Sequence, residues 1–129
     1  MITRWMPESV LLEVRAADAA ARAARAVPGV VRLQPGVWGL VGQLAARVWE
    51  QATGQALPDL AGVRAELVDG IGVAVDVQLV VDGGYQAAAV GTAVHDAVRA
   101  ALTRAAGLVV TEVQVHIVEV DLTADQDQD

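Results

Sequence analysis

The chain has 129 residues, the size of one globular domain, and 54% of them are hydrophobic although it contains no Phe and no Cys. The lack of Cys excludes disulfides, thiolate catalysis and Cys-ligated zinc. A formal net charge of -7 repels phosphate backbones and anionic lipid, so nucleic acid is a poor default partner. Ala and Val supply most of the apolar residues, which predicts a core of small and β-branched side chains.

The two ends of the chain differ in character from its middle. Residues 1–7 lead directly into a charged segment, so they lack the continuous apolar region of a signal peptide. The longest uncharged stretch, residues 33–46, is shorter than the ~20 residues of a membrane span. We therefore expect a cytoplasmic protein without direct transmembrane insertion, in which residues 1–7 are flexible, residues 8–122 form one domain and residues 123–129 are a disordered acidic tail.

A first helix is predicted to begin near Glu8 or Ser9, because Pro7 fits the first helical turn. Apolar residues then recur at steps of three and four, and polar residues form a second stripe that we interpret as a solvated face. The apolar stripe is Val10, Val14, Ala17, Ala21 and Ala24, and the polar stripe is Arg15, Asp18, Arg22 and Arg25. Asp18 and Arg22 have the spacing of a weak surface ion pair. Pro28 and Gly29 end the helix.

The next stretch predicts a short strand from Val30 to Leu33, followed by a segment whose structure the sequence leaves open. Within the segment from Gln34 to Leu60, apolar residues from Trp38 to about Ala52 fall at helical spacing, but Gly39 and Gly42 each weaken a helix by roughly 1 kcal/mol. The segment is therefore either a helix or an irregular loop.

Two tryptophans of this segment are candidate interaction residues. Trp38 and Trp49 are three helical turns apart and would share one face of a helix. A membrane-surface helix normally carries several basic residues, and Arg47 is the only one here. We therefore expect the two indoles to pack against the domain or against a partner.

A β-hairpin is predicted in the middle of the chain. Val63, Ala65 and Leu67 alternate with Arg64, Glu66 and Val68, and Asp69-Gly70 is a strong signal for a two-residue turn. In the following strand one face is apolar, comprising Ile71, Val73, Val75, Val77, Leu79 and Val81. The other face carries small and polar residues, so we expect a sheet that is covered on one side, with its second face open or in an interface.

A second helix and a last strand complete the predicted domain. The helix has an apolar stripe and ends at Gly107; the stripe comprises Val90, Val94, Ala97, Ala101 and Leu102. The strand from Thr111 to Ile117 follows a helical crossover and is therefore expected to lie parallel to the strand before the helix. After Ile117 the alternation changes phase, which a bulge, an exit from the sheet or an oligomer contact would explain. We select Val118, Val120 and Leu122 as further candidate interaction residues.

No combination of residues predicts a catalytic, metal or cofactor site. His95 and His116 lack the paired spacing of a metal helix, and Ser9, the only Ser in the chain, is better explained as a helix cap. On the open face of the sheet Glu66, Asp76 and Glu112 offer oxygen ligands, but Arg64 is available to pair with one of them. The sequence therefore predicts a protein without catalytic residues or cofactors.

Several segments of the chain follow one another in a distinctive order and spacing. They are the alanine-rich helix that closes in Val27-Pro28-Gly29-Val30-Val31, the run Gly62-Val63-Arg64-Ala65-Glu66-Leu67, the Val-rich strand to Val81, and the final run from Gly107 to Ile117. Together these segments resemble the alkaline shock protein family of envelope stress response proteins. The resemblance implies a non-enzymatic protein of cell-envelope homeostasis in Gram-positive bacteria. It also implies a cytoplasmic location, with some members held at the membrane through a partner protein. The segment from Gln34 to Leu60 departs from the family pattern.

Together these observations predict an α+β fold, in which a small mixed sheet of three to four strands carries two main helices on one face. The expected order is α-β-(α)-β-β-α-β. The leading functional hypothesis is a self-associating scaffold or adaptor at the cytoplasmic side of the membrane, forming homo-oligomers and binding a membrane-anchored protein. The alternative is a small ligand- or metal-binding regulatory domain that uses the open face around Asp76, Gln78 and His116.

Overall fold

A computed structural model describes residues 8–34, 62–106 and 109–123 of the chain. In chain order the elements are α1 (Glu8–Arg25), β1 (Val30–Leu33), β2 (Val63–Val68), β3 (Gly72–Asp82), α3 (Ala87–Ala106) and β4 (Val109–Asp121). This order confirms the predicted sequence of elements. The predictions for residues 1–7, 35–60 and 124–129, including those for Trp38 and Trp49, lie outside the described residues.

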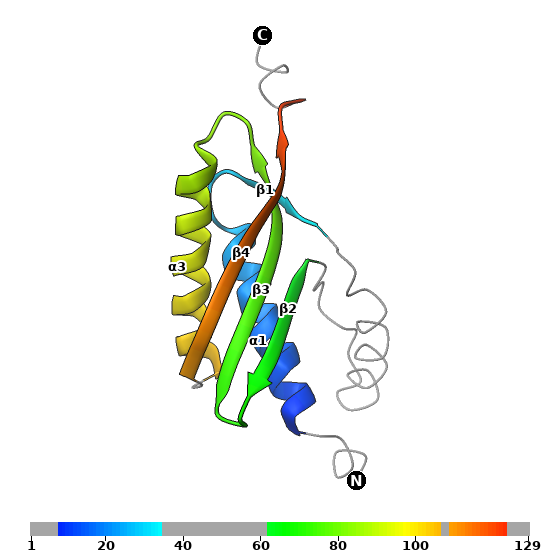
Figure 1. The fold of residues 1–129 in the computed structure, drawn as a ribbon, viewed down its shortest axis with the longest axis vertical. Helices are drawn as coiled ribbons and strands as arrows, with labels where there is room; N and C mark the ends of the chain where they lie inside the picture. The colour runs from blue at the N-terminus through cyan, green and yellow to red at the C-terminus, as the bar shows by residue number, and fades with distance from the viewer. Residues whose placement is uncertain (1–7, 35–61, 107–108, 124–129) are drawn as a thin grey trace.

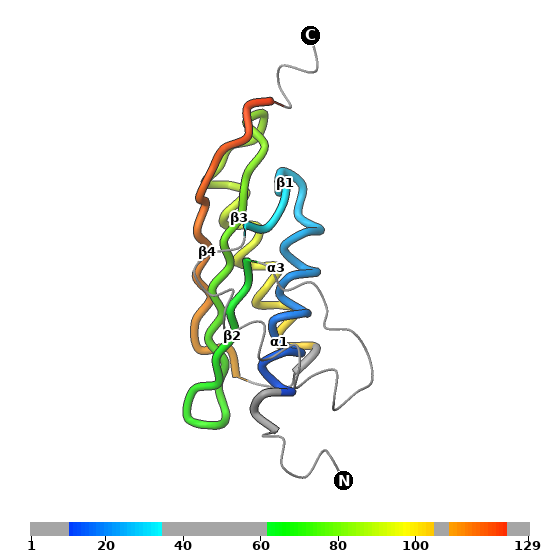
Figure 2. Tube along the Cα trace, turned by 90° about the vertical axis from the view of Figure 1, so that its right-hand side faces the viewer, coloured from blue at the N-terminus to red at the C-terminus, as the bar shows by residue number. Residues whose placement is uncertain are grey.

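The domain has two layers, a mixed sheet and a pair of helices that covers one of its faces (Figure 1). β3 is the central strand, with β4 parallel to it on one side and β1 and β2 antiparallel to it on the other. Turned by 90°, the molecule shows both helices on the same side of the sheet, while the opposite face carries neither of them (Figure 2). The predicted α+β fold is thereby confirmed.

β1 and β2 occupy one edge of β3 as two pieces of an interrupted strand. The backbone N–H of Gln34 donates to the carbonyl of Gln78 at 2.9 Å, and the N–H of Gln78 donates to the carbonyl of Gly62 at 2.8 Å. Gly62 has a positive φ of 83°, and a Cβ added there would lie 2.8 Å from the backbone nitrogen of Gln34. Gln34 and Gly62 therefore lie beside each other at this edge of the sheet, next to Gln78.

Small side chains form the core between the two layers, as the composition predicts. On β3 the helix-facing row is fully or almost fully buried and comprises Val73, Val75, Val77, Leu79 and Val81. Facing it, α1 contributes Ala16, Ala17, Ala20, Ala21 and Ala24, and α3 contributes Val90, Val94, Val98 and Leu102. Val98 belongs to the buried row of α3, whereas Ala97, which the predicted stripe included, is only partly buried. Alanines on α1 permit a close approach of the helices because they add little volume at the interface.

The predicted hairpin turn is present, but Ile71, the residue that follows it, does not lie on the apolar face as predicted. Asp69 and Gly70 both have positive φ, at 55° and 75°, as a type I′ turn requires. Ile71, which the alternation placed on the apolar face, is 71% exposed because β3 begins only at Gly72.

The phase change in β4 coincides with a β-bulge. Ile117 lies opposite Leu79, but the next pair joins Glu119 to Val80, which leaves Val118 as the extra residue. Of the three explanations that the sequence left open, the structure supports the bulge. If β4 continued past Ile117 in regular register, with Val118 opposite Val80, Glu119 would lie opposite Val81 on the helix-facing side, so the bulge keeps this carboxylate out of the core.

Candidate interaction face

The face of the sheet opposite the helices is called the open face here, and its residues follow from the strand register. Residues opposite each other on neighbouring strands share a face, so each polar residue of β3 has polar neighbours. Three rows run across it: Glu66–Ala74–Glu112, Arg64–Asp76–Gln114, and Gln78 beside His116. A fourth position has Val80 between Arg32 and Glu119. The sequence prediction of a sheet with one open polar face is thus confirmed up to this last row.

The middle of the open face contains short local contacts. His116 Nε2 lies 3.7 Å from Asp76 Oδ1, Arg64 lies 3.8 Å from Glu66, and the Gln114 amide donates to Glu112 at 2.6 Å. Within the described parts of the chain, no three side chains of His, Cys, Asp and Glu come together as a metal site would require. This face offers charge and hydrogen-bonding groups along its length instead of a focused centre.

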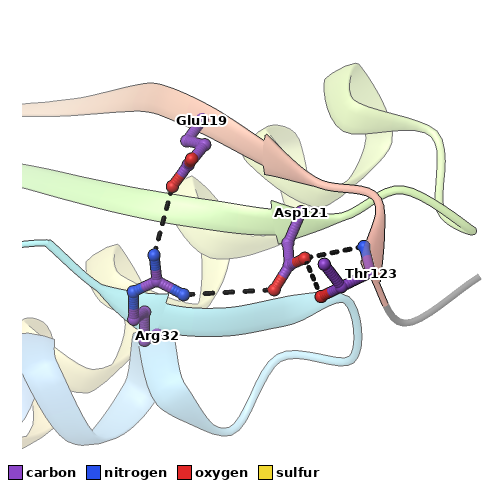
Figure 3. Close-up of polar contacts among 4 residues, drawn as sticks. All are labelled: Arg32, Glu119, Asp121 and Thr123. Carbon is purple, nitrogen blue, oxygen red and sulfur yellow. Dashed lines mark hydrogen bonds and ion pairs between the residues drawn. The ribbon is translucent and has the colours of Figure 1, made fainter. Parts of the chain in front are cut away.

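An ion pair crosses the central strand at one end of the open face. Arg32 Nη2 on β1 lies 3.1 Å from Glu119 Oε2 on β4, and the line between the two groups passes over β3 (Figure 3). Val80, the β3 residue between them in the register, is fully buried although it does not belong to the helix-facing core cluster. The aliphatic parts of two long side chains therefore help to shield an apolar residue on the otherwise polar side of the sheet.

Asp121 extends this polar group towards the end of β4. One carboxylate oxygen accepts hydrogen bonds from both the backbone N–H and the hydroxyl of Thr123, and the other lies 4.0 Å from Arg32 (Figure 3). The hydrogen bonds from Thr123 lower the pKa of Asp121 below its usual value of 3.8, and the positive charge of Arg32 adds to the effect. Asp121 therefore stays negatively charged at the pH of a cell.

The apolar candidates from the end of β4 are exposed. Val118 is 47%, Val120 is 44% and Leu122 is 60% accessible. Val118 is the bulge residue, whereas Val120 lies opposite Val81 of the helix-facing row. The three side chains therefore do not form one row on one face.

The two histidines are kept apart by the sheet. His95 lies on α3, where its Nδ1 is 3.3 Å from Asp96 Oδ1, and His116 lies on the open face. The side chain of Ser9 is outside the described residues. The arrangement of the two imidazoles offers no shared site.

The outer face of the helix layer carries an excess of arginines. Reasoning from the sequence did not predict this excess. Exposed arginines lie on both helices, namely Arg15, Arg22, Arg25, Arg99 and Arg104. The carboxylates among the described side chains of α1 and α3 are Glu13, Asp18 and Asp96. Glu13 accepts a hydrogen bond from the backbone of Leu67 on β2 and Asp18 pairs with Arg22 at 3.2 Å, as predicted. Two signals in the sequence point to this face, the polar stripe of α1 and the arginines of α3.

The open face carries an excess of carboxylates. Its register positions include Glu66, Asp76, Asp82, Glu112, Glu119 and Asp121, against Arg32 and Arg64. The net charge of -7 therefore conceals an uneven distribution, in which most of the described carboxylates lie on the sheet and most of the described arginines on the helices.

Neither helix that the structure describes combines the length and apolar character needed to cross a membrane.

Comparison with solved structures finds the "MamM CTD" carrying three substitutions. It is 17% identical, with a TM-score of 0.47 over 82% of this chain and 93% of the other. No curated protein matches the chain. The sequence profile of the alkaline shock protein family, described as having a cell envelope-related function, matches residues 15–122. The match includes nearly every element described above, and the chain therefore belongs to this family.

Proposed function

We propose that the protein is a non-enzymatic scaffold or adaptor of the envelope stress response, which associates with itself at the cytoplasmic side of the cell membrane. The observation that carries the proposal is the half-covered sheet: one face packs on the helices and the other presents a long polar surface. A solvated antiparallel face is common, but here the central strand is eleven residues long and its charges are segregated from those of the helices. Membership of a family with a cell envelope-related function supports a role at the cell envelope.

The absence of a focused centre on the open face supports a role in binding and not in catalysis. A catalytic site brings titratable groups together in a cleft and perturbs their pKa values. Here the imidazole of His116 and the carboxylate of Asp76 are 3.7 Å apart, and both side chains are partly exposed, at 46% and 33%. The proposed partners are further copies of the chain and a membrane-anchored protein, which the family resemblance suggests.

The direct test is recovery of the chain from membranes of its native host. A tagged chain, expressed at its natural level, is crosslinked in cells and purified from the membrane and soluble fractions. We expect complexes that contain several copies of the chain together with a membrane-anchored protein. Recovery only as a free monomer from the soluble fraction would contradict the proposal.

A thermal-shift screen separates the proposal from the alternative of a ligand- or metal-binding domain. The probes are divalent cations and common small metabolites, and the control is a variant with Asp76→Asn and His116→Gln, which removes the central pair of the open face. We expect no stabilisation that depends on these two residues. A saturable increase in melting temperature that the control variant loses would favour the alternative.

A further inference from the structure

We infer that the arginine-bearing outer face of the helix layer of one copy docks on the acidic open face of the sheet of the next copy. This inference rests on the proposed self-association and specifies its surfaces. The two faces lie on opposite sides of the same molecule, so a contact between them is heterologous and repeats without closing on itself. The product is an open chain of copies and not a closed two-fold dimer.

Charge complementarity is the first observation behind this mode of assembly. The described helices present Arg15, Arg22, Arg25, Arg99 and Arg104, whereas the open face presents carboxylates on all three of the strands β2, β3 and β4. Two helix layers would oppose arginine to arginine, and two sheet faces would oppose carboxylate to carboxylate. Stacking of helix layer on sheet is therefore the favoured face-to-face contact of two copies.

The dimensions of the two faces agree. With the usual rise per residue, the eleven residues of β3 span about 36 Å and the twenty residues of α3 about 30 Å. A face three strands wide measures about 15 Å across, which gives a patch of about 500 Å² on each copy. The total of about 1,000 Å² is at the lower limit for a specific interface, so each contact is weak and the assembly is reversible.

The helix layer also has a shape that admits carboxylate side chains. A shallow hollow between α1 and α3 is lined by alanines and by two arginines, and comprises Ala19, Arg22, Ala23, Ala101 and Arg104. None of the large exposed apolar side chains in the described parts of the chain lies on α1 or α3. This face is thus suited to ionic contact with an acidic surface and poorly suited to insertion among lipid tails.

The test uses two charge-reversed variants of the full chain. The helix-face variant carries Arg22→Glu and Arg104→Glu, and the sheet-face variant carries Glu66→Lys and Glu112→Lys. Sedimentation velocity at low salt is expected to show association of the wild type and its weakening by at least about tenfold in each variant alone. Mixing the two variants is expected to restore association, because the reversed faces match each other. Each double substitution changes the formal charge by about four units, so both variants remain net acidic from a start of -7.

A single substitution on α3 serves as the matched control. Asp96→Lys makes the same change in net charge as Glu112→Lys, but on the basic face of the molecule. We expect Asp96→Lys to retain or strengthen association and Glu112→Lys to weaken it. If both variants behave alike, net charge and not the pairing of two faces governs association, and the inference is wrong. Thermal unfolding of every variant verifies that it is folded.

Three outcomes overturn the inference. The first is association that persists in both variants separately, which indicates another interface. The second is a wild type that remains monomeric at every concentration. The third is a monomeric wild type that binds vesicles containing phosphatidylserine and loses this binding in the helix-face variant, which would assign the arginines to a membrane surface. Recovery from the membrane fraction of the host is independent of these results, so failure of the stacking mode is distinguishable from failure of the proposed envelope function.

Discussion

Arg32 and Glu119 come from opposite edges of the sheet, are 87 residues apart in the chain, and meet at 3.1 Å across Val80 of the central strand. Both neighbours of β3 have an irregular register at this level, with an extra residue at Val31 on β1 and at Val118 on β4. The irregularities place both charged residues opposite the same valine. The end of the sheet is thus joined by side chains as well as by backbone hydrogen bonds.

A double-mutant cycle with Arg32→Ala and Glu119→Ala measures this interaction. The two side chains are about half exposed, so we expect a coupling energy of about 0.2–1 kcal/mol that disappears in roughly 1 M salt. Urea unfolding of the four proteins gives the value. A coupling energy that is unchanged by salt would show that the contact is packing between the side chains and not an ion pair.

Gly29 and Gly70 form a matched pair for testing close packing at a positive φ. At Gly29 an added Cβ would lie 2.7 Å from Val90 Cγ2 and 2.9 Å from Tyr85 Cγ, whereas at Gly70 nothing lies within 4 Å. Gly70→Ala is expected to cost about 1 kcal/mol from backbone strain, and Gly29→Ala a further ~1–3 kcal/mol from overpacking. Urea unfolding measures the free energy of unfolding of both variants. An equal decrease in the two variants would contradict close packing between the α1–β1 turn and α3.

The bulge at Val118 predicts different responses to two single-residue deletions. Deletion of Val118 leaves Ile117, Glu119 and Val120 in regular alternation, so we expect a folded protein with a small loss of stability. Deletion of Val115 moves His116 to a helix-facing position, and burial of its imidazole is expected to cost about 1–3 kcal/mol more. Thermal and urea unfolding compare the two. A greater loss for the Val118 deletion would show that the bulge itself stabilises the fold.

The hydrogen bonds from Thr123 predict the titration of Asp121. Because they lower the pKa of Asp121 in the folded state, its contribution to stability is present above the unfolded-state pKa and is lost as the pH falls through the folded-state pKa. Thr123→Val removes the hydroxyl donor, so the pKa of Asp121 is expected to rise towards 3.8. NMR titration of the carboxyl carbon measures the change, with Thr103→Val on α3 as the control. An unchanged pKa would show that the hydroxyl of Thr123 has no part in the shift.

Local patterns were sufficient to predict most of the fold. Alternation identified β2 and β3, the Asp69-Gly70 pair identified their turn, and the helical period identified α1 and α3, because each of these signals depends on neighbouring residues. The helical crossover also predicted that β4 lies parallel to β3, as observed. Register could not be predicted in this way, because the extra residue at Val118 is defined by pairing with a strand far away in the sequence.

The charged faces needed the fold before they could be recognised. On α1 the sequence indicated a polar stripe, but only the structure shows that its arginines are exposed together with Arg99 and Arg104 of α3, in a helix layer that covers one face of the sheet (Figure 2). In the same way, carboxylates spread from Glu66 to Asp121 fall on one face only through the register of three strands. A net charge and a linear pattern contain no information about which faces oppose each other.

Sedimentation velocity of the full wild-type chain, over a range of concentrations at low salt and at about 1 M salt, tests the central claim most directly. The monomer has a mass of 13.4 kDa. Contact between oppositely charged faces predicts a mass that grows with concentration at low salt, passes beyond the dimer, and returns to the monomer at high salt. A monomer under all conditions, or a dimer that salt does not dissociate, would contradict it.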